Sequence, residues 1–270
     1  MSATVNLAGV PETMLWTLHN RASEARRADT YLRDPDCVRI YEAIDYDYLR
    51  SFGRPDDSHP MRSKVFDAAV KPWMKAHPGG TVVELAAGLE TQFQRCDDGQ
   101  VRWLCVDVPD AIAVRERFLQ PTERCRHLAK SALDLSWMDE VDASRGVFVT
   151  AQGLLMYFDE ADVRQLLVAI LERFPGVEIM FDVIPPWFSR KTLTGQGYGK
   201  TRYYTAPRMP WGVSRGQVEP LLRSWSDRIW KVSVRPYGFA RGAGVLLLKV
   251  CPIVPILRNM PPCIVHLRAV

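Results

Sequence analysis

Two positions that lie nineteen residues apart could together bind the sugar of a nucleoside. Gly88 stands in a loop that directly follows the apolar run Thr81–Leu85, and Asp107 ends the next such run. Where a parallel strand ends, a glycine lets the backbone approach a ligand, because it has no Cβ. An acidic residue about 20 positions further on is placed to accept both ribose hydroxyls of an adenosine. The same residues would also suit a plain turn between a strand and a helix.

The loop itself narrows the kind of adenosine ligand. It reads Glu84-Leu-Ala-Ala-Gly-Leu-Glu90 and contains a single glycine and no Gly-Lys-Ser or Gly-Lys-Thr. A loop that cradles a pyrophosphate needs more glycines or that lysine motif. The residues therefore favour S-adenosylmethionine over a dinucleotide such as NAD.

Metal and general-base chemistry have little support in the sequence. No two of the six cysteines are closer than nine residues, so no CxxC pair exists. The five histidines form no HxH or HExxH pattern, and none has an acidic partner at a useful spacing. His77, in His-Pro-Gly-Gly, indicates a turn. We therefore expect no metal site, reduced buried thiols and no dedicated catalytic residue.

The composition excludes several classes of protein. Apolar residues make up 47% of the 270 residues and charged residues 24%, which is typical of a globular chain and not of a disordered one. The net charge of +4 is spread thinly, without a block of five like charges, so we expect no nucleic-acid partner. No apolar run approaches the roughly 18 residues of a membrane span, and the start lacks a secretory pattern. We expect a cytoplasmic protein with no membrane partner.

The elements that must position these residues follow from hydrophobic periodicity. Amphipathic patterns predict helices at 9–28, 35–50 and 62–76. Short apolar runs then predict strands, with helices at 109–119 and 159–174 between some of them; the strands are 81–85, 101–106, 126–130, 147–150 and 177–183. Continuous apolar strands that alternate with helices are typical of a parallel sheet covered on both faces.

The end of the chain has a different pattern. Runs at 229–234 and 243–250 are too close for a helical crossover, so they should pair as an antiparallel hairpin. We divide the chain into an N-terminal helical lid (1–60), a ligand-binding domain (61–250) and an irregular tail (251–270) that contains four prolines. The segment 184–213 is rich in Pro, Gly, Tyr and Trp and should form a cap over the ligand. In the lid, we expect Arg21 to be solvated or paired with Glu24.

Several motifs in order resemble the leucine carboxyl methyltransferase family. They are Arg62-x4-Asp67, the stretch from His77 to Arg95, Val106-Asp-Val-Pro109 with Arg115, Ser131-x2-Asp134 with Trp137, and Gly153-Leu-Leu-Met-Tyr157. The similarity runs from roughly Pro11 to Val250. Pro207–Gly212 and Ile44–Asp47 look most like the branch of polyketide-synthesis O-methyltransferases of the tetracenomycin type.

The resemblance implies a class I α/β methyltransferase fold (Rossmann-like) and an S-adenosylmethionine site. It implies that Arg62 holds the methionine carboxylate, that Asp107 holds the ribose, and that Asp134 and Leu135 flank the adenine. The full set of expected cofactor-binding residues is Arg62, Glu84, Ala86, Gly88, Asp107, Val108, Asp134, Leu135 and Gln152. Three of the loop positions depart from the family pattern. Gln152 replaces a residue that is acidic in many relatives, Ala86 replaces the first glycine, and Glu90 replaces the usual aspartate.

The acceptor is expected to be a small molecule that takes the methyl group on oxygen. An ionised carboxylate needs no general base, whereas a phenol usually does, and the histidines offer no evident base. We therefore expect methyl ester formation on an aromatic, polyketide-like acid by in-line displacement. Aromatic and cationic residues of the cap should contact it: Tyr157, Trp187, Arg190, Arg202, Tyr203, Tyr204 and Trp211. The alternatives are a phenolic hydroxyl, a protein's terminal carboxylate, or a binding protein that has kept the fold and lost turnover.

Overall fold

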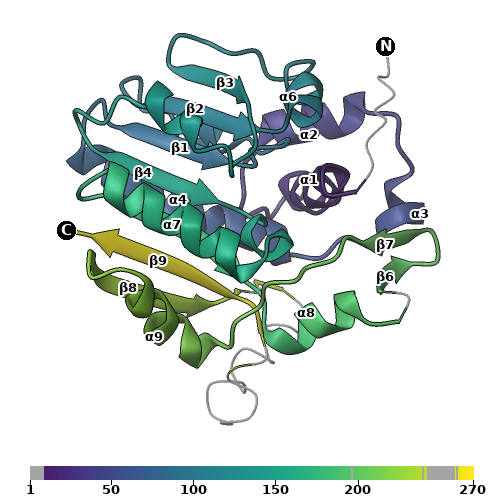
Figure 1. Cartoon of the computed structure of the whole chain (residues 1–270). Helices are drawn as coiled ribbons and strands as arrows, with labels where there is room; N and C mark the ends of the chain where they lie inside the picture. The colour runs from purple at the N-terminus through teal and green to yellow at the C-terminus, as the bar shows by residue number, and fades with distance from the viewer. Residues whose placement is uncertain (1–8, 196, 239, 242–258, 260) are drawn as a thin grey trace.

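A sheet with the strand order β3-β2-β1-β4-β5-β9-β8 forms the centre of the described part of the chain (Figure 1). The computed structural model describes residues 9–195, 197–238, 240–241, 259 and 261–270. Five neighbouring strands are parallel, namely β1 (Thr81–Leu85), β2 (Arg102–Asp107), β3 (Cys125–Ala129), β4 (Val147–Ala151) and β5 (Glu178–Val183). These are the five strands that the sequence predicts, with ends shifted by one residue or so.

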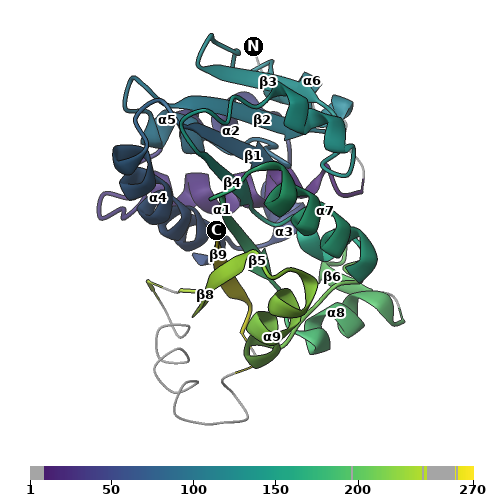
Figure 2. The same ribbon diagram turned by 60° about the vertical axis from the view of Figure 1, so that its left-hand side comes forward.

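Alternation along β1 sends neighbouring side chains into two different cores. Val82 packs in a cluster with Phe66 of α4 (Ser58–Ala76), whereas Val83 packs in a cluster with Val163 of α7 (Glu160–Arg173). Figure 2 shows the two helices on opposite sides of the sheet. Because both faces are covered, every residue of β1 and β4 is buried. The shorter helices α5 (Gln92–Cys96), α6 (Pro109–Arg115) and η1 (Leu135–Glu140) connect strands around this frame.

The N-terminal helices form a third apolar cluster. Leu15 and Leu18 of α1 (Thr13–Ala25) are fully buried there, together with Ile40 of α2 (Pro35–Ala43). The single helix expected at 35–50 is in fact two. Ile44 is extended (φ −93°, ψ 122°), and the side chain of Asp47 accepts from the Arg50 N–H to start α3 (Tyr48–Phe52). Asp47 offers its carboxylate as an N-cap, which favours a new helix start over continuation.

The cap region contains a short helix and a small hairpin. Helix α8 (Pro186–Leu193) precedes β6 (Tyr198–Thr201) and β7 (Tyr204–Ala206), which pair antiparallel as a separate sheet. The hairpin lies against α3, where Thr201 Oγ1 donates to the carbonyls of Arg50 and Ser51 at 3.0 and 2.9 Å. The 3₁₀ turn η2 (Leu155–Tyr157) follows β4, and α9 (Arg215–Trp225) follows the hairpin.

The antiparallel end of the sheet differs from the expected hairpin. Strand β8 (Ile229–Pro236) pairs with β9 (Cys263–Ala269), which lies between β5 and β8. The strand predicted at 243–250 lies outside the described residues. The tail was expected to be irregular because of its four prolines, and for 263–269 that expectation is wrong. Those prolines all precede the last eight residues, whose apolar side chains, such as Val265 and Leu267, are fully buried.

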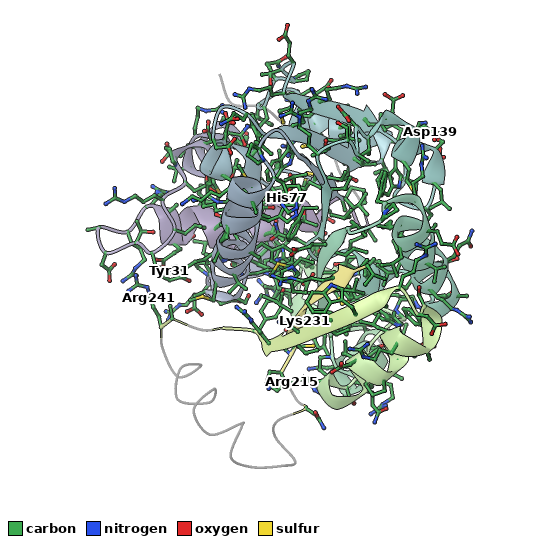
Figure 3. All side chains as sticks on the ribbon, turned by 90° about the vertical axis from the view of Figure 1, so that its left-hand side faces the viewer. Tyr31, His77, Asp139, Arg215, Lys231 and Arg241 are labelled. Atoms are coloured by element: carbon green, nitrogen blue, oxygen red, sulfur yellow. The ribbon has the colours of Figure 1, made fainter. Side chains whose placement is uncertain are left out.

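A contact near the end of β8 joins the sheet to the N-terminal helices. The Arg241 guanidinium pairs with Glu24 at 3.1 Å and Asp29 at 2.6 Å, and lies 5.5 Å from the centre of the Tyr31 ring. Figure 3 shows Tyr31 and Arg241 side by side at the surface. This contact links segments that are more than two hundred residues apart in the sequence. Among the described residues, no helix is both long and apolar enough to cross a membrane.

Candidate functional site

A cavity of about 500 Å³ opens where the parallel strands end. The loops that follow β1, β2 and β4 form one side of it, and α1, α4 and β6 form the other. Seven of the nine predicted cofactor residues border the cavity. Arg62 does so from α4, and the other six lie at the ends of β1, β2 and β4 or just after them: Glu84, Ala86, Gly88, Asp107, Val108 and Gln152. Ligands of open α/β sheets bind at this edge.

The loop after β1 has an unusual backbone that Asp107 holds in place. Ala86 and Gly88 both have positive φ angles, 55° and 44°. The Gly88 N–H donates to Asp107 Oδ2 and the Val108 N–H donates to Oδ1, each at 2.8 Å. Burial raises the pKa of Asp107, and the two N–H donors oppose that shift. Each carboxylate oxygen keeps further lone pairs that a ligand hydroxyl could use.

Buried arginines fasten the same loop from behind. Arg115 Nη1 donates to the carbonyls of Gly88 at 3.0 Å and Glu90 at 2.7 Å. Arg21 Nη2 donates to the Leu89 carbonyl at 2.8 Å, and its Nη1 reaches Glu90 Oε1 at 3.0 Å. The expectation that Arg21 is solvated or paired with Glu24 is therefore wrong. Arg21 is fully buried, because α1 packs its inner face directly against the loop.

Arg62 lies in a buried polar cluster at the carboxyl ends of β4 and β5. Its Nη1 donates to Asp182 Oδ2 at 3.0 Å and to the Tyr237 hydroxyl at 3.4 Å. Tyr237 and the Gly153 N–H also donate to Asp182. Burial alone would lower the pKa of Arg62, but Tyr237 and Asp182 raise it, so the guanidinium stays charged. Asp182 and Tyr237 were not singled out from the sequence.

Gln152 presents an unused acceptor beside this cluster. Its Nε2 donates to Gln92 Oε1 at 3.3 Å, whereas its buried Oε1 has no hydrogen-bond partner among the described residues. A buried carbonyl oxygen without a partner is unfavourable by roughly 1–3 kcal/mol. Since Gln152 borders the cavity, a ligand N–H group would satisfy that oxygen.

Three of the predicted cofactor residues, Asp134, Leu135 and Glu84, have positions or partners that do not suit a contact with the cofactor. Asp134 and Leu135 do not border the cavity, and Ser131 and Ala132 lie there in their stead. The exposed Asp134 carboxylate accepts from Ser136 N and Oγ as the cap of η1, which turns it away from a ligand role. Glu84 borders the cavity, but its Oε2 accepts from Trp103 Nε1 at 3.1 Å and burial raises its pKa strongly.

The expected acceptor residues are mostly placed elsewhere. Of the seven, all of them described, Tyr157 alone borders the cavity. Tyr204 is buried against Phe52, and Trp211 packs in the core beside Phe181. The other four, Trp187, Arg190, Arg202 and Tyr203, are exposed. Composition distinguished the segment 184–213, but it could not tell which faces of α8 and the β6–β7 hairpin turn inward.

The acceptor side is lined by residues that sequence reasoning missed. Tyr198 and Lys200 of β6 both border the cavity, and the pairing of β6 with β7 shifts register between Gly199 and Thr201. Lys200 Nζ lies 3.3 Å from Asp56 Oδ2 and 4.8 Å from the centre of the Trp16 ring. The sequence predicted no strand over 198–201, so it offered no signal that would bring these two side chains together.

His59 is the second omission, because the sequence indicated no acidic partner at a useful spacing for any histidine and no role for this ring. Its Nδ1 lies 2.8 Å from Asn20 Nδ2, and Asn20 also donates to Asp56 Oδ1 at 3.0 Å. Because an amide NH₂ group can only donate, Nδ1 accepts and the ring proton lies on Nε2. Burial, reinforced by Arg62, lowers the pKa of His59 to about 3, so the ring is neutral at pH 7.

Comparisons with known proteins place the chain in a family. A family model for leucine carboxyl methyltransferase matches residues 15–171. The chain is 32% identical over 257 residues to the tetracenomycin polyketide synthesis O-methyltransferase of Streptomyces glaucescens, over 91% of this chain and 94% of the relative. It is 28% identical over 233 residues to an S-adenosyl-L-methionine-dependent methyltransferase of Gibberella zeae, over 76% and 78% of the two chains.

Solved structures agree on the fold. The N-methyltransferase NodS of Bradyrhizobium japonicum WM9, in complex with S-adenosyl-L-homocysteine, superposes with a TM-score of 0.50 at 10% identity, over 94% of this chain and 98% of that chain. The CurJ carbon methyltransferase superposes with a TM-score of 0.53 at 11% identity, over 96% and 67%. At such identities the likeness concerns the fold alone. The class I α/β methyltransferase fold expected from the sequence is confirmed.

Proposed function

This chain belongs to the leucine carboxyl methyltransferase family and is an S-adenosylmethionine-dependent O-methyltransferase, and from that premise we propose that it forms the methyl ester of a small aromatic acid. The proposal has two parts, namely how this chain's residues hold the cofactor and which oxygen accepts the methyl group. When bound, S-adenosylmethionine would supply a methyl group on a cationic sulfur for in-line transfer to the acceptor oxygen, with the thioether as leaving group.

The proposal for the cofactor rests on three side chains that can still accept or donate hydrogen bonds. The Asp107 carboxylate, oriented by the N–H groups of Gly88 and Val108, would accept the ribose hydroxyls. The unpartnered Gln152 Oε1 would accept from the cofactor's ammonium. Arg62 Nε is likewise buried without a partner among the described residues, and its guanidinium would bind the methionine carboxylate. These groups suit the cofactor, because each supplies a donor or acceptor that the folded chain leaves unused.

The acceptor part rests on one observation, the state of His59. The imidazole borders the cavity as a neutral ring with its proton on Nε2, and its pKa of about 3 makes it a poor base at pH 7. It can instead donate a hydrogen bond. A carboxylate acceptor is already ionised and has lone pairs for that donor, whereas a phenol would need its proton removed. The structure thus favours a carboxyl acceptor.

The walls of the cavity fit a flat, acidic molecule. Trp16, Phe188 and Tyr198 provide aromatic surface, and the Lys200 ammonium adds a cation beside it. Burial raises the pKa of Tyr157 to about 12, so its hydroxyl stays protonated. The residues of this chain therefore orient the acid, shield it from water and leave the chemistry to proximity.

A matched pair of acceptors tests the assignment. The purified protein is incubated with methyl-labelled S-adenosylmethionine and either an aromatic hydroxy acid or the same molecule with a carboxamide. We expect label only in the acid, as a methyl ester that mild base releases as methanol. Label in the carboxamide, stable to base, would show phenol methylation instead. Binding of S-adenosylhomocysteine without transfer to any acid of a panel would indicate a binding protein.

A further inference from the structure

Two cysteines and a histidine meet on the α6 side of strands β2 and β3. Cys105 lies on β2, and Cys125 and His127 lie on β3, where the parallel register pairs Cys105 with His127. One ligand atom from each of the three residues lies within 4.8 Å of the other two. The sequence predicted no metal site because twenty residues separate the two cysteines, but a parallel β crossover brings them together.

The cluster is buried and incompletely satisfied. The Cys105 side chain is fully buried, the Cys125 residue is 2% exposed, and the His127 side chain is 1% exposed. Arg115 Nε donates to His127 Nε2 at 3.2 Å, so the proton of the neutral ring lies on Nδ1. That Nδ1 has no hydrogen-bond partner within the described ranges, although the Glu116 carboxylate stands 3.4 Å away.

We propose that Cys105, Cys125 and His127 form a binding site for a soft divalent metal ion, Zn²⁺. Two thiolates and an imidazole are the donors that Zn²⁺ prefers, with Zn–S near 2.3 Å and Zn–N near 2.0 Å, and a water can complete a tetrahedron. His127 Nε2 binds the ion in exchange for the hydrogen bond from Arg115 Nε, while Arg115 Nη1 keeps its bonds to the Gly88 and Glu90 carbonyls. The Nδ1–H then points at Glu116, which is the carboxylate–histidine–metal arrangement that usually orients a ligating imidazole.

The charge balance of the site is favourable. Binding releases both thiol protons to solvent, so two negative sulfurs neutralise Zn²⁺ beside the permanent charge of Arg115. No electron is transferred, and the ring of His127 keeps its single proton. Glu116 is 43% exposed, so the carboxylate beside His127 lies at the protein surface.

The test is equilibrium dialysis of the chelator-treated full chain against buffered Zn²⁺, with bound metal counted by mass spectrometry. We expect about one tightly bound Zn²⁺ per wild-type chain. Binding should be lost in Cys125→Ser and in His127→Asn. It should persist in Cys96→Ser, which removes a buried thiol outside the cluster. Equal binding in all four proteins, or no binding to wild type, would overturn the proposal.

A second measurement needs no variant, in case Cys125→Ser fails to fold. Co²⁺ is added to the wild-type chain, and the absorption spectrum is recorded. We expect thiolate-to-metal charge-transfer bands and the intense visible bands of tetrahedral Co²⁺, which added Zn²⁺ abolishes. A spectrum of hydrated, octahedral Co²⁺ would contradict the site. Neither measurement depends on methyl transfer, so the two proposals can fail separately.

Discussion

Glu90 shows how a single buried side chain holds the loop that follows β1. It accepts from Arg21 and Arg95 through Oε1, at 3.0 and 2.7 Å, and from Ser63 through Oε2 at 3.0 Å. Burial alone would raise the pKa of Glu90, but Arg21 and Arg95 hold it well below its usual range. Glu90 therefore ties the loop after β1 to α1, α4 and α5. Spacing alone could not predict this, because the partners come from three separate helices.

Ala86 has a left-handed backbone conformation that is unfavourable for alanine. Its φ of 55° is the left-handed region, which costs an alanine roughly 1 kcal/mol or more and a glycine very little. We expect Ala86→Gly to raise the free energy of unfolding by about 0.5–1 kcal/mol, since relief of strain exceeds the added freedom of the unfolded chain. Urea unfolding measures this, with Ala143→Gly in an exposed turn as control. A lower stability in Ala86→Gly would contradict the strain.

Gln152 offers a direct test of the ammonium contact. In Gln152→Glu, a carboxylate replaces the unpartnered amide oxygen, so the contact to the ammonium becomes an ion pair instead of a bond between an ion and a neutral amide. We expect S-adenosylhomocysteine to bind about tenfold more tightly, equivalent to about 1.4 kcal/mol. Calorimetry gives the affinity. An unchanged or weaker Kd would remove position 152 from the ammonium site.

His59 makes stability depend on pH in a definite direction. Its folded pKa of about 3 lies below the ordinary value of 6.5, so the unfolded chain binds the extra proton first. The stability present above pH 6.5 is therefore lost as the pH falls toward 3, by at most about 1.4 kcal/mol per pH unit. Asp56, Arg62, Lys200 and Arg21 are the charged groups that act on the ring.

Replacement of the imidazole should flatten this dependence. We expect the free energy of unfolding of His59→Asn to fall less steeply than that of wild type between pH 6 and pH 4.5. Denaturant unfolding at several pH values supplies the slopes. Identical slopes would mean that His59 is not held neutral by burial.

At the scale of elements, periodicity predicted the frame and missed its exceptions. The five parallel strands and the helices α1, α4 and α7 follow directly from apolar runs and 3.6-residue stripes. The break between α2 and α3 depends on one capping aspartate, Asp47, within an otherwise helical pattern. Strand β9 was not predicted, because the four prolines that precede it indicated an irregular tail. The inward face of β6 depends on how the hairpin packs on α3, which composition does not contain.

The interior position of β9 makes a sharp prediction. Val265 is fully buried between β5 and β8, whereas Val270, at the end of the same segment, is 64% exposed. We expect Val265→Asp to destabilise the fold by at least about 3 kcal/mol, because it loses apolar burial and places a carboxylate in the core.

Val270→Asp is the matched control and should change stability by no more than about 0.5 kcal/mol. Thermal and urea unfolding of both variants decide the point. If Val265→Asp were as stable as Val270→Asp, residues 263–269 would not form an interior strand.

At the scale of the whole molecule, the site divides into a half that could be predicted and a half that could not. Gly88, Asp107 and Gln152 follow strand ends, and parallel strands bring their ends to one edge wherever the sheet forms. The opposite wall combines α1, α4 and β6. Its geometry depends on tertiary packing, so Trp16, His59 and Lys200 emerged only from the structure. The wall at the strand ends thus follows from the sheet topology. The opposite wall depends on how α1, α4 and β6 pack together.

The binding of S-adenosylhomocysteine to wild type, Asp107→Ala and Asp110→Ala, measured by titration calorimetry, tests the central claim most directly. Asp107 holds the cofactor loop and borders the cavity, whereas Asp110 is an exposed residue of α6 three positions away. The account predicts binding to wild type, binding at least about tenfold weaker in Asp107→Ala because the ribose acceptor is lost, and unchanged affinity in Asp110→Ala. Equal affinity in all three proteins, or no binding to wild type, would contradict it.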